Sequence, residues 1–515
     1  MIRRVKTENG WVKGLPAADP RITSYKGIPF AAPPVGENRW RAPQPCADWE
    51  GDYPAYDFAP IPLQVHQPLD DKNIYTREWA VDPDIEMSED CLYLNIWAPA
   101  RENEARNLPV FVWYFGGGLQ VGHTAEMEFD GERIARRGIV VVTVAYRLNA
   151  FGFLAHPEIT AESPDAPGNF GFLDQQFATQ WVKRNIAAFG GDPENITIGG
   201  QSAGGMSVSA QMLDKANEGL FQRAIIQSGC FVPPYPSNFG LSGSLSEAEE
   251  KGKRFFEELG VKTLAEARKI DEKTLHDKAN EWYGRLGEAV DGVKRPRKSQ
   301  EWFIEERRVH CPVLMGCTDS EFIASPPVSS KEELVHFVRA NYGKRAEEII
   351  ACFDGCNTAE EIKRRGSISS ILFAMRAAAY INDRKENPDK FYSYVFCPEI
   401  PGWDNPGTFH SVDLWFFFET LAKCWRPFKG WHYDLARNMC DYWVNFIRTG
   451  DPNGLDSQGE ALPEWLAFTA KEPEWMRFDR EVRAEPCQND ELVELLLDAY
   501  LESKGMEEGV REDMN

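Results

Sequence analysis

Short runs of hydrophobic residues recur along the chain and predict buried β-strands. A strand that is covered on both faces has no polar side, so its sequence is a nearly continuous apolar run. Such runs lie at residues 92–97, 110–114, 139–144, 196–198, 224–226 and 312–315. Residues 5–14 and 22–28 instead alternate and contain β-branched residues, which is typical of antiparallel strands.

Helical stretches separate several of these strands. Residues 175–187 and the residues after Ala203 have the apolar spacing of helices. Buried strands that alternate with helices predict an α/β fold, in which a central, mostly parallel mixed sheet is flanked by helices. We interpret the charged, helix-rich stretches at 245–288 and 330–387 as insertions that form a cap over the sheet, within a single domain over residues 1–515.

The chain is acidic. Its 515 residues include 57 Lys and Arg against 80 Asp and Glu, a formal net charge of −23. This charge argues against nucleic acid and anionic membrane surfaces as partners, because both repel an acidic protein. The acid-rich residues 489–515 are expected to form a solvated terminal helix that frays.

Neither a membrane span nor a secretory signal is expected. No apolar run approaches the roughly 20 residues that cross a bilayer, and no apolar segment follows the charged residues 1–6. The eleven cysteines contain no C-x-x-C pair, and no second pair or histidine cluster completes a zinc site around Cys352 and Cys356. Unclustered cysteines without a signal predict a cytoplasmic protein with free thiols and no metal.

The segment Gly200-Gln201-Ser202-Ala203-Gly204 is the strongest sign of chemistry. A G-x-S-x-G pattern is weak alone, but here an apolar strand precedes it and a helical segment of small residues follows it. A tight strand-to-helix turn needs glycine on both sides of the serine, because the serine backbone is strained and neighbouring chains pass close. The hydroxyl then lies at a helix N-terminus, where negative charge is favoured. Ser202 is therefore the predicted nucleophile.

A glycine-rich loop supplies a candidate oxyanion hole. Gly116, Gly117 and Gly118 come just after the strand at 110–114. Three glycines allow backbone N–H groups to turn toward one point, and the N–H of Ala203 completes the set. Phosphate binding is the alternative use of such a loop, but no Gly-Lys-Ser/Thr follows it.

A serine nucleophile needs an acid and a histidine, in that order along the chain. Three histidines lie beyond a plausible acid, namely His336, His410 and His432. His410 is favoured because it follows a loop and precedes an apolar helix. Asp319 and Glu321 both follow the strand at 312–315, at a strand end that suits an active-site loop. Spacing does not decide between the two carboxylates.

Six longer segments match one family. They are residues 25–31 (YKGIPFA), 88–95 (SEDCLYLN), 168–175 (GNFGFLDQ), 189–193 (FGGDP), 227–229 (QSG) and 449–453 (TGDPN). Through them the chain resembles the type-B carboxylesterase family of α/β-hydrolases, which includes cholinesterases and bacterial para-nitrobenzyl esterases. The resemblance implies the α/β-hydrolase fold with a gorge under the helical cap. It also implies a triad of Ser202, Glu321 and His410, with Gly117, Gly118 and Ala203 as oxyanion donors.

The chain departs from the family pattern at several positions. Gln201 stands where the family usually has Glu, which removes a negative charge beside the nucleophile and weakens the case for a choline-like substrate. Phe322 replaces a glycine and is expected to narrow its loop. Cys91 matches half of a family disulfide, but residues 59–64 hold no cysteine, so that bridge is expected to be missing. Trp79 lies in the loop of the choline-binding tryptophan of cholinesterases with a different spacing, and a packing role is preferred.

The resemblance also implies supporting residues. Gln201, Ser228 and Asp413 are candidates for a polar layer around the triad, in which Ser228 and Asp413 hold His410 or a buried water. The alternative for these two is a buried hydroxyl and a helix cap. Four further residues match positions that line the family's gorge and are candidate walls of the substrate pocket: Leu119, His123, Phe231 and Tyr235.

The sequence therefore predicts a serine carboxylesterase that hydrolyses a small-molecule ester through an acyl-enzyme on Ser202, without a cofactor or a metal. One alternative is a non-catalytic, adhesion-type binding protein of the same fold, against which the intact Ser202, Glu321 and His410 argue. Hydrolysis of amides, carbamates or thioesters, or acyl transfer to another alcohol, would use the same residues. The sequence does not specify the natural substrate or the oligomeric state.

Overall fold

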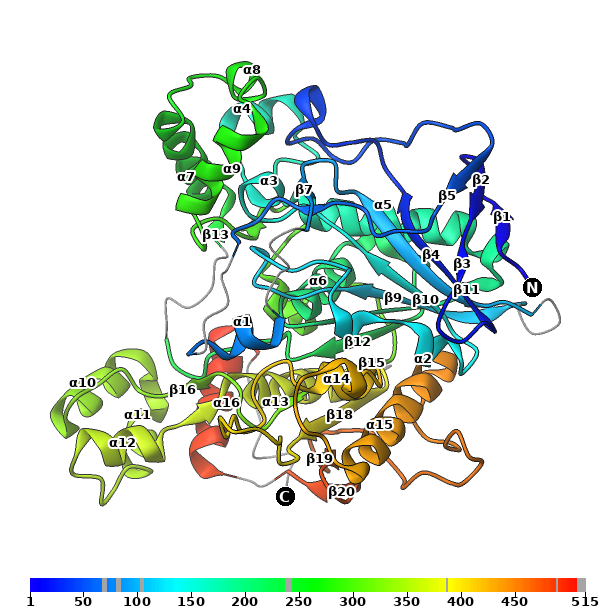
Figure 1. Ribbon diagram of the computed structural model, residues 1–515. Helices are drawn as coiled ribbons and strands as arrows, with labels where there is room; N and C mark the ends of the chain where they lie inside the picture. The colour runs from blue at the N-terminus through cyan, green and yellow to red at the C-terminus, as the bar shows by residue number, and fades with distance from the viewer. Residues whose placement is uncertain are drawn as a thin grey trace.

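The computed structural model describes residues 1–66, 72–79, 85–101, 106–236, 243–385, 388–487 and 490–506. Within these residues a central sheet of eleven strands, in the order β20-β19-β18-β15-β12-β11-β9-β10-β8-β4-β3, runs through the molecule (Figure 1). The pairs from β10 to β19 are parallel, whereas the pairs at both edges are antiparallel. This arrangement confirms the predicted mostly parallel, mixed sheet.

Seven strands of the central sheet (β4, β8, β9, β10, β11, β12 and β15) overlap the stretches predicted from the sequence, whereas β3, β18, β19 and β20 were not predicted and residues 5–14 form a separate antiparallel pair, β1–β2. Among the described residues the central sheet has eleven strands. They are β3 (Leu15–Pro16), β4 (Ile22–Pro29), β8 (Tyr93–Pro99), β9 (Leu108–Tyr114), β10 (Val140–Val144), β11 (Gly191–Gln201), β12 (Arg223–Gln227), β15 (Val313–Thr318), β18 (Phe391–Phe396), β19 (Glu474–Phe478) and β20 (Arg483–Pro486). Short strands outside it are β1 (Arg4–Lys6), β2 (Trp11–Lys13), β5 (Asp52–Pro54), β6 (Ile61–Pro62), β7 (Met87–Ser88), β13 (Gly243–Ser244), β14 (Ala289–Val290), β16 (Ile323–Ala324) and β17 (Ile368–Ser369).

The helices of the described residues lie between these strands. They are α1 (Ile74–Trp79), α2 (Glu132–Ala135), α3 (Asn149–Phe153), α4 (Pro157–Glu162), α5 (Phe170–Asn185), α6 (Ala203–Leu213), α7 (Leu245–Glu258), α8 (Leu264–Ala267), α9 (Glu272–Glu281), α10 (Lys331–Asn341), α11 (Ala346–Ala351), α12 (Ala359–Arg365), α13 (Ser370–Asp383), α14 (Asp413–Phe417), α15 (Gly430–Thr449) and α16 (Glu491–Ser503). The helix expected at 175–187 begins five residues earlier, at Phe170.

Both faces of the sheet are buried, as its apolar strands require. Successive side chains of a strand point to opposite faces. In β9, Val110 and Val112 belong to one hydrophobic cluster and Phe111 and Trp113 to another. The parallel strands therefore carry two cores, and their carboxyl ends meet along one edge, where ligands bind in open α/β sheets.

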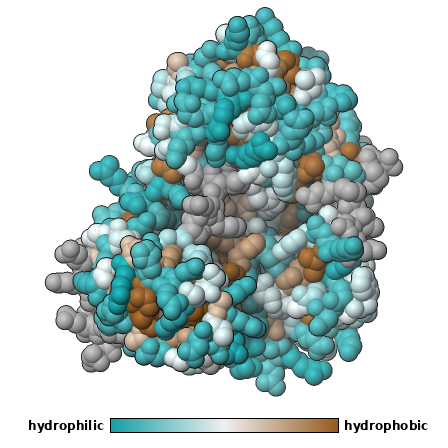
Figure 2. All heavy atoms as spheres, turned by 90° about the vertical axis from the view of Figure 1, so that its left-hand side faces the viewer, coloured by the Kyte–Doolittle hydropathy of each residue, from teal (hydrophilic) through white to brown (hydrophobic). Residues whose placement is uncertain are grey.

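The two helical insertions lie apart from each other beside this edge. Helices α7 to α9 form a group at the upper left of Figure 1, and α10 to α12 form a second group at the lower left. The surface is hollowed between them, with hydrophobic atoms inside the hollow (Figure 2). The antiparallel pair β16–β17, which is separate from the central sheet, joins the chain before α10 to the chain after α12. The last helix of the second insertion, α13, packs on β15 and belongs to the main body rather than to a cap.

The prediction of a solvated helix over residues 489–515 is wrong for its described part. Helix α16 buries Leu492, Leu495, Leu496, Leu497 and Leu501 in the main core. Its acidic residues are paired, because Asp498 accepts from Arg345 at 2.8 Å and Glu494 forms an ion pair with Arg376. Residues 507–515 of that prediction lie outside the described residues.

The cysteines all lie in the described parts of the chain. The eleven side chains are free thiols, and Cys91 is buried. No helix in the described ranges has the length and apolar character that are needed to cross a lipid bilayer.

Candidate active site

Ser202 lies in the tight turn between β11 and α6. Its backbone has φ 56° and ψ −124°, a conformation that L residues rarely adopt. The turn depends on its glycines, because a Cβ on Gly204 would lie 2.0 Å from the Tyr114 carbonyl oxygen. A Cβ on Gly200 would likewise lie 2.3 Å from the Gly204 carbonyl. The predicted strained strand-to-helix turn is therefore present, and it presents Ser202 at the helix N-terminus.

Glu321 and His410 form a buried pair. Glu321 follows β15, His410 precedes α14, and His410 Nδ1 lies 2.7 Å from Glu321 Oε2. The other carboxylate oxygen, Oε1, accepts from Ser228 Oγ at 2.5 Å and from Thr318 Oγ1 at 3.0 Å. Asp319 is exposed, so the structure brings only Glu321 to the histidine.

The Glu321 carboxylate is held in its ionised form. Burial alone raises its pKa, but the charge and hydrogen bond of His410 and the bonds from Ser228 and Thr318 act in the opposite direction. The net effect lowers the pKa of Glu321. An ionised acceptor at Nδ1 requires that this nitrogen carries the proton, so Nε2 of the neutral ring has a free lone pair.

Gln201 uses this lone pair. Its amide Nε2 lies 3.2 Å from His410 Nε2, which is the geometry of an N–H donor to an imidazole acceptor. The Gln201 side chain is buried, and its amide lines the same cavity as Ser202. A glutamate in its place could not donate this bond.

The loop of three glycines faces Ser202. A Cβ on Gly116 would lie 3.2 Å from the Ser202 Cβ, and Gly117 and Gly118 have φ of 104° and 65°. Among the described residues, neither the Gly117 N–H nor the Gly118 N–H has a hydrogen-bond acceptor. These two donors border the cavity and are available to a ligand oxygen.

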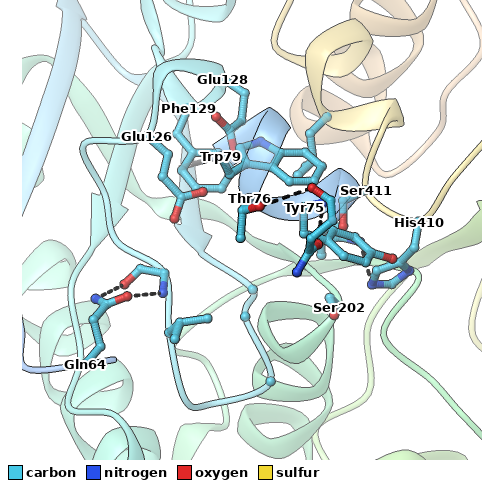
Figure 3. A pocket seen from close by; sticks show the side chains of 18 of the residues that line it. Gln64, Tyr75, Thr76, Trp79, Glu126, Glu128, Phe129, Ser202, His410 and Ser411 are labelled. Atoms are coloured by element: carbon cyan, nitrogen blue, oxygen red, sulfur yellow. Dashed lines mark hydrogen bonds between the residues drawn. The ribbon is translucent and has the colours of Figure 1, made fainter. Parts of the chain in front are cut away.

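A cavity of about 480 Å³ connects these groups. Ser202 and His410 line it together with Gln201, the three glycines and Phe322, whose ring centroid lies 4.9 Å from that of His410. Figure 3 shows Ser202 and His410 on one side of it. From the first insertion, Tyr283 just after α9 contributes to the wall. A volume of this size accommodates a small organic molecule.

The four predicted pocket residues do not line this cavity among the described residues. Leu119 and His123 are buried within the loop that follows the glycines, and the Tyr235 hydroxyl donates to the Gly366 carbonyl at 2.8 Å. Phe231 contacts Phe322 and approaches His410, with ring centroids at 5.1 and 6.3 Å. Phe231 and Tyr235 instead line a second cavity of about 300 Å³. A match in sequence does not specify which side of a loop faces the site.

Other residues complete the wall of the cavity. They are Gln64, Tyr75, Thr76, Trp79, Glu126, Glu128 and Phe129 (Figure 3). Trp79 packs as expected, because its indole stacks on Tyr75 and contacts Phe409 edge-on, and it also borders the cavity. Sequence reasoning missed the others. Their only local signal is the pair of glutamates a few residues after the glycine loop.

Ser228 and Asp413 support the pair in different ways. Ser228 bonds to Glu321 and not to the histidine. The Asp413 carboxylate accepts from the Tyr394 hydroxyl at 2.8 Å and from Gln227 Nε2 at 3.1 Å. Among the described residues Asp413 has no hydrogen bond to His410, so neither residue holds the ring directly.

Known proteins share this architecture over nearly the whole chain. The model of the carboxylesterase family matches residues 2–494. Para-nitrobenzyl esterase of Bacillus subtilis (strain 168) is 31% identical over 93% of this chain and 96% of its own length. Carboxylesterase 5A of Canis lupus familiaris is 30% identical over 96% of this chain and 88% of its own. Acetylcholinesterase of Bungarus fasciatus is 29% identical over 93% of this chain and 83% of its own length.

Solved structures agree with the sequence comparison. A PNB esterase superposes with a TM-score of 0.79 at 28% identity, over 96% of this chain and 99% of that one. A thermophilic PNB esterase superposes with a TM-score of 0.77 at 28% identity, over 96% of this chain and 100% of that one. The chain therefore belongs to the carboxylesterase family: it is a carboxylic-ester hydrolase with the α/β-hydrolase fold.

Proposed function

We propose that the protein is a serine carboxylesterase in which Ser202, Glu321 and His410 are the catalytic triad. The observation that carries the proposal is the cavity that Ser202 and His410 share, with the His410 Nδ1 bonded to a buried, ionised Glu321. An acceptor at Nδ1 orients the ring and stabilises its positive charge, while Nε2 is left to take the serine proton.

The reaction then has two similar halves. Ser202 Oγ attacks the ester carbonyl carbon while its proton moves to His410 Nε2, which requires that the Gln201 amide moves aside. The alcohol leaves with that proton, and water repeats the attack on the acyl-enzyme. The N–H groups of Gly117, Gly118 and Ala203 bind the oxyanion, and each is worth about 3 kcal/mol in comparable sites.

The test is hydrolysis of small-molecule esters by matched serine variants. p-Nitrophenyl esters from acetate to octanoate, and the benzoate, measure the acyl preference. Ser202→Ala is expected to lower kcat by about four orders of magnitude or more, because it removes the nucleophile. Ser209→Ala is the control, since Ser209 lies in α6 and among the described residues its hydroxyl bonds to the Gly205 carbonyl alone.

Full activity of Ser202→Ala, or equal losses in both variants, would reject the assignment. The corresponding anilides, carbamates and thioesters distinguish an esterase from a hydrolase of those bonds. Turnover of one of them above its matched ester would replace the ester assignment. A folded wild type without turnover of any of these substrates would favour the non-catalytic alternative.

A further inference from the structure

The general base of the proposed triad is bonded to a side chain that is not the nucleophile. The Gln201 amide nitrogen lies 3.2 Å from His410 Nε2, whereas the Ser202 hydroxyl makes no hydrogen bond among the described residues. A neutral imidazole has one lone pair at this nitrogen, so only one donor can use it at a time. The Gln201 amide and the Ser202 hydroxyl therefore compete for the same atom.

The amide has no second hydrogen bond in the described structure. Gln201 is 2% exposed, and His410 is the only hydrogen-bond partner of its side chain among the described residues. When Ser202 attacks an ester, His410 Nε2 takes the serine proton and becomes a donor itself. It can then no longer accept from the amide, and a buried donor without an acceptor costs the full desolvation of that group. Each turnover therefore carries this cost unless the substrate supplies an acceptor.

The alcohol part of the ester is the part of the substrate that lies beside the amide. His410 Nε2 passes its proton to the alcohol oxygen, so this oxygen must come within hydrogen-bond distance of Nε2. The amide nitrogen lies at a similar distance from the same atom, and Gln201 lines the cavity with Ser202 and His410. An ether or hydroxyl oxygen two carbons beyond the ester oxygen is therefore placed to accept from the amide. An alkyl alcohol offers no acceptor there.

We propose that Gln201 is a positioning residue that caps the base in the resting site and selects esters whose alcohol carries an acceptor oxygen two carbons beyond the ester oxygen. The inference rests on the proposed function, since it names the substrate class of the same cavity. An alcohol with such an oxygen takes over the bond of the amide and frees His410 Nε2 for Ser202. An alkyl ester meets a free base only when the amide is left unpaired, so a smaller fraction of the protein is competent to react with it.

Two isosteric esters test the inference. 2-Methoxyethyl butyrate and n-butyl butyrate differ only in an ether oxygen that replaces a methylene group. Gln201→Met keeps the length of the side chain and removes the N–H donor. The kcat/KM of this variant for the butyl ester is expected to rise about fivefold, the effect of one neutral hydrogen bond, while the value for the methoxyethyl ester stays within about twofold. Comparison of the ratio of the two values between wild type and variant cancels the intrinsic reactivity of the esters.

Further variants separate the hydrogen bond from a structural effect. Gln201→Asn carries its amide on a side chain that is one methylene shorter, which withdraws the amide from Nε2, so this variant is expected to behave as Gln201→Met does. Gln44→Met, at an exposed position outside the described cavity wall, should leave both esters unchanged. A fall of kcat/KM for both esters in the two Gln201 variants, or a ratio equal to that of wild type, would overturn the inference.

Inactivation by phenylmethanesulfonyl fluoride separates this inference from the proposed function. Ser202 Oγ bonds to the sulfur, fluoride leaves and the serine proton moves to His410 Nε2, so the reaction needs the free base but involves no alcohol. The rate constant of inactivation is expected to rise about fivefold in Gln201→Met. Equal rate constants in both proteins, with ester turnover that Ser202→Ala abolishes, would reject the role of Gln201 and leave the triad intact. Neither inactivation nor hydrolysis in either protein would reject the triad and the role of Gln201 together.

Discussion

Asp413 is a residue whose ionisation is tied to the fold. Its carboxylate is completely buried, and one oxygen accepts two hydrogen bonds while the other has no donor among the described residues. Burial raises the pKa of Asp413 to about 6, although the bonds from Tyr394 and Gln227 act against this. The folded protein therefore holds a proton on Asp413 at pH values at which the unfolded chain has released it.

This difference makes the contribution of Asp413 to stability depend on pH. Because the folded pKa is the higher one, the contribution is fully present below about pH 4 and is lost as the pH rises through about 6. A shift of about two units corresponds to about 3 kcal/mol. Asn cannot ionise, so Asp413→Asn is expected to gain up to this amount relative to wild type between about pH 4.5 and 7.5.

Thermal unfolding of both proteins at the two pH values checks this prediction. A difference in melting temperature that stays constant with pH would contradict it. Turnover of a neutral ester, measured in parallel, shows whether Asp413 also supports the reaction. Unchanged turnover in Asp413→Asn would confine its role to the fold.

Single residues also show what local sequence can reveal. Ser202 could be predicted because its turn needs glycines at fixed positions, which leaves a trace in the sequence. The choice between Asp319 and Glu321 could not be made from spacing, because it depends on which side chain the end of β15 turns toward His410. The donors to the Glu321 carboxylate, His410, Ser228 and Thr318, come from three separate segments.

At the scale of elements, α16 packs against α13 and stabilises this part of the core. Leu495 is completely buried in the main core, and Tyr500 packs edge-on against Phe373 in α13, with centroids 5.9 Å apart. Leu495→Ala is expected to lower the free energy of unfolding by about 3 kcal/mol, since it removes buried apolar surface and leaves a cavity.

Chemical denaturation with Ser503→Ala as the matched control measures this effect. Ser503 is exposed at the end of the same helix. A loss below about 1 kcal/mol in Leu495→Ala, or an equal loss in both variants, would mean that α16 does not stabilise the core.

The elements differ in how far their sequence predicts them. The central strands were predicted because strands buried on both faces are apolar throughout. The buried environment of α16 was not predicted from the sequence. The excess of acidic residues in this segment suggested a helix that is exposed to solvent. Their partners, Arg345 and Arg376, lie more than a hundred residues away along the chain. Long-range ion pairs leave no local pattern.

At the scale of the whole molecule, the net charge of −23 affects which substrates arrive. A negative protein attracts cationic molecules over a distance that salt shortens. The kcat/KM for a cationic ester, 2-(dimethylamino)ethyl butyrate, is expected to fall several-fold between about 10 mM and about 500 mM NaCl, while the value for the neutral 3-methylbutyl butyrate stays nearly constant. If the kcat/KM values of the two esters change equally with salt, the net charge of the protein does not accelerate the binding of the cationic ester.

The cavity wall is also a property of the whole molecule. Its residues come from α1, from the loop after β9 and from the end of α9, which are far apart in the sequence. Only the packing of the fold brings Trp79, Glu128 and Tyr283 together. Motifs of the family therefore indicated Ser202, Glu321 and His410, whereas the other residues that line the cavity became visible only in three dimensions.

The imidazole of His410 is bonded at both nitrogens before any ligand arrives. Glu321 accepts from one, Gln201 lies within bonding distance of the other, and Phe322 packs edge-on against the ring. A side chain held in this way has few rotamers left to lose. The entropy of ordering the imidazole is thus spent once, during folding, and Glu321 and Phe322 keep the ring in place when the Gln201 amide moves away.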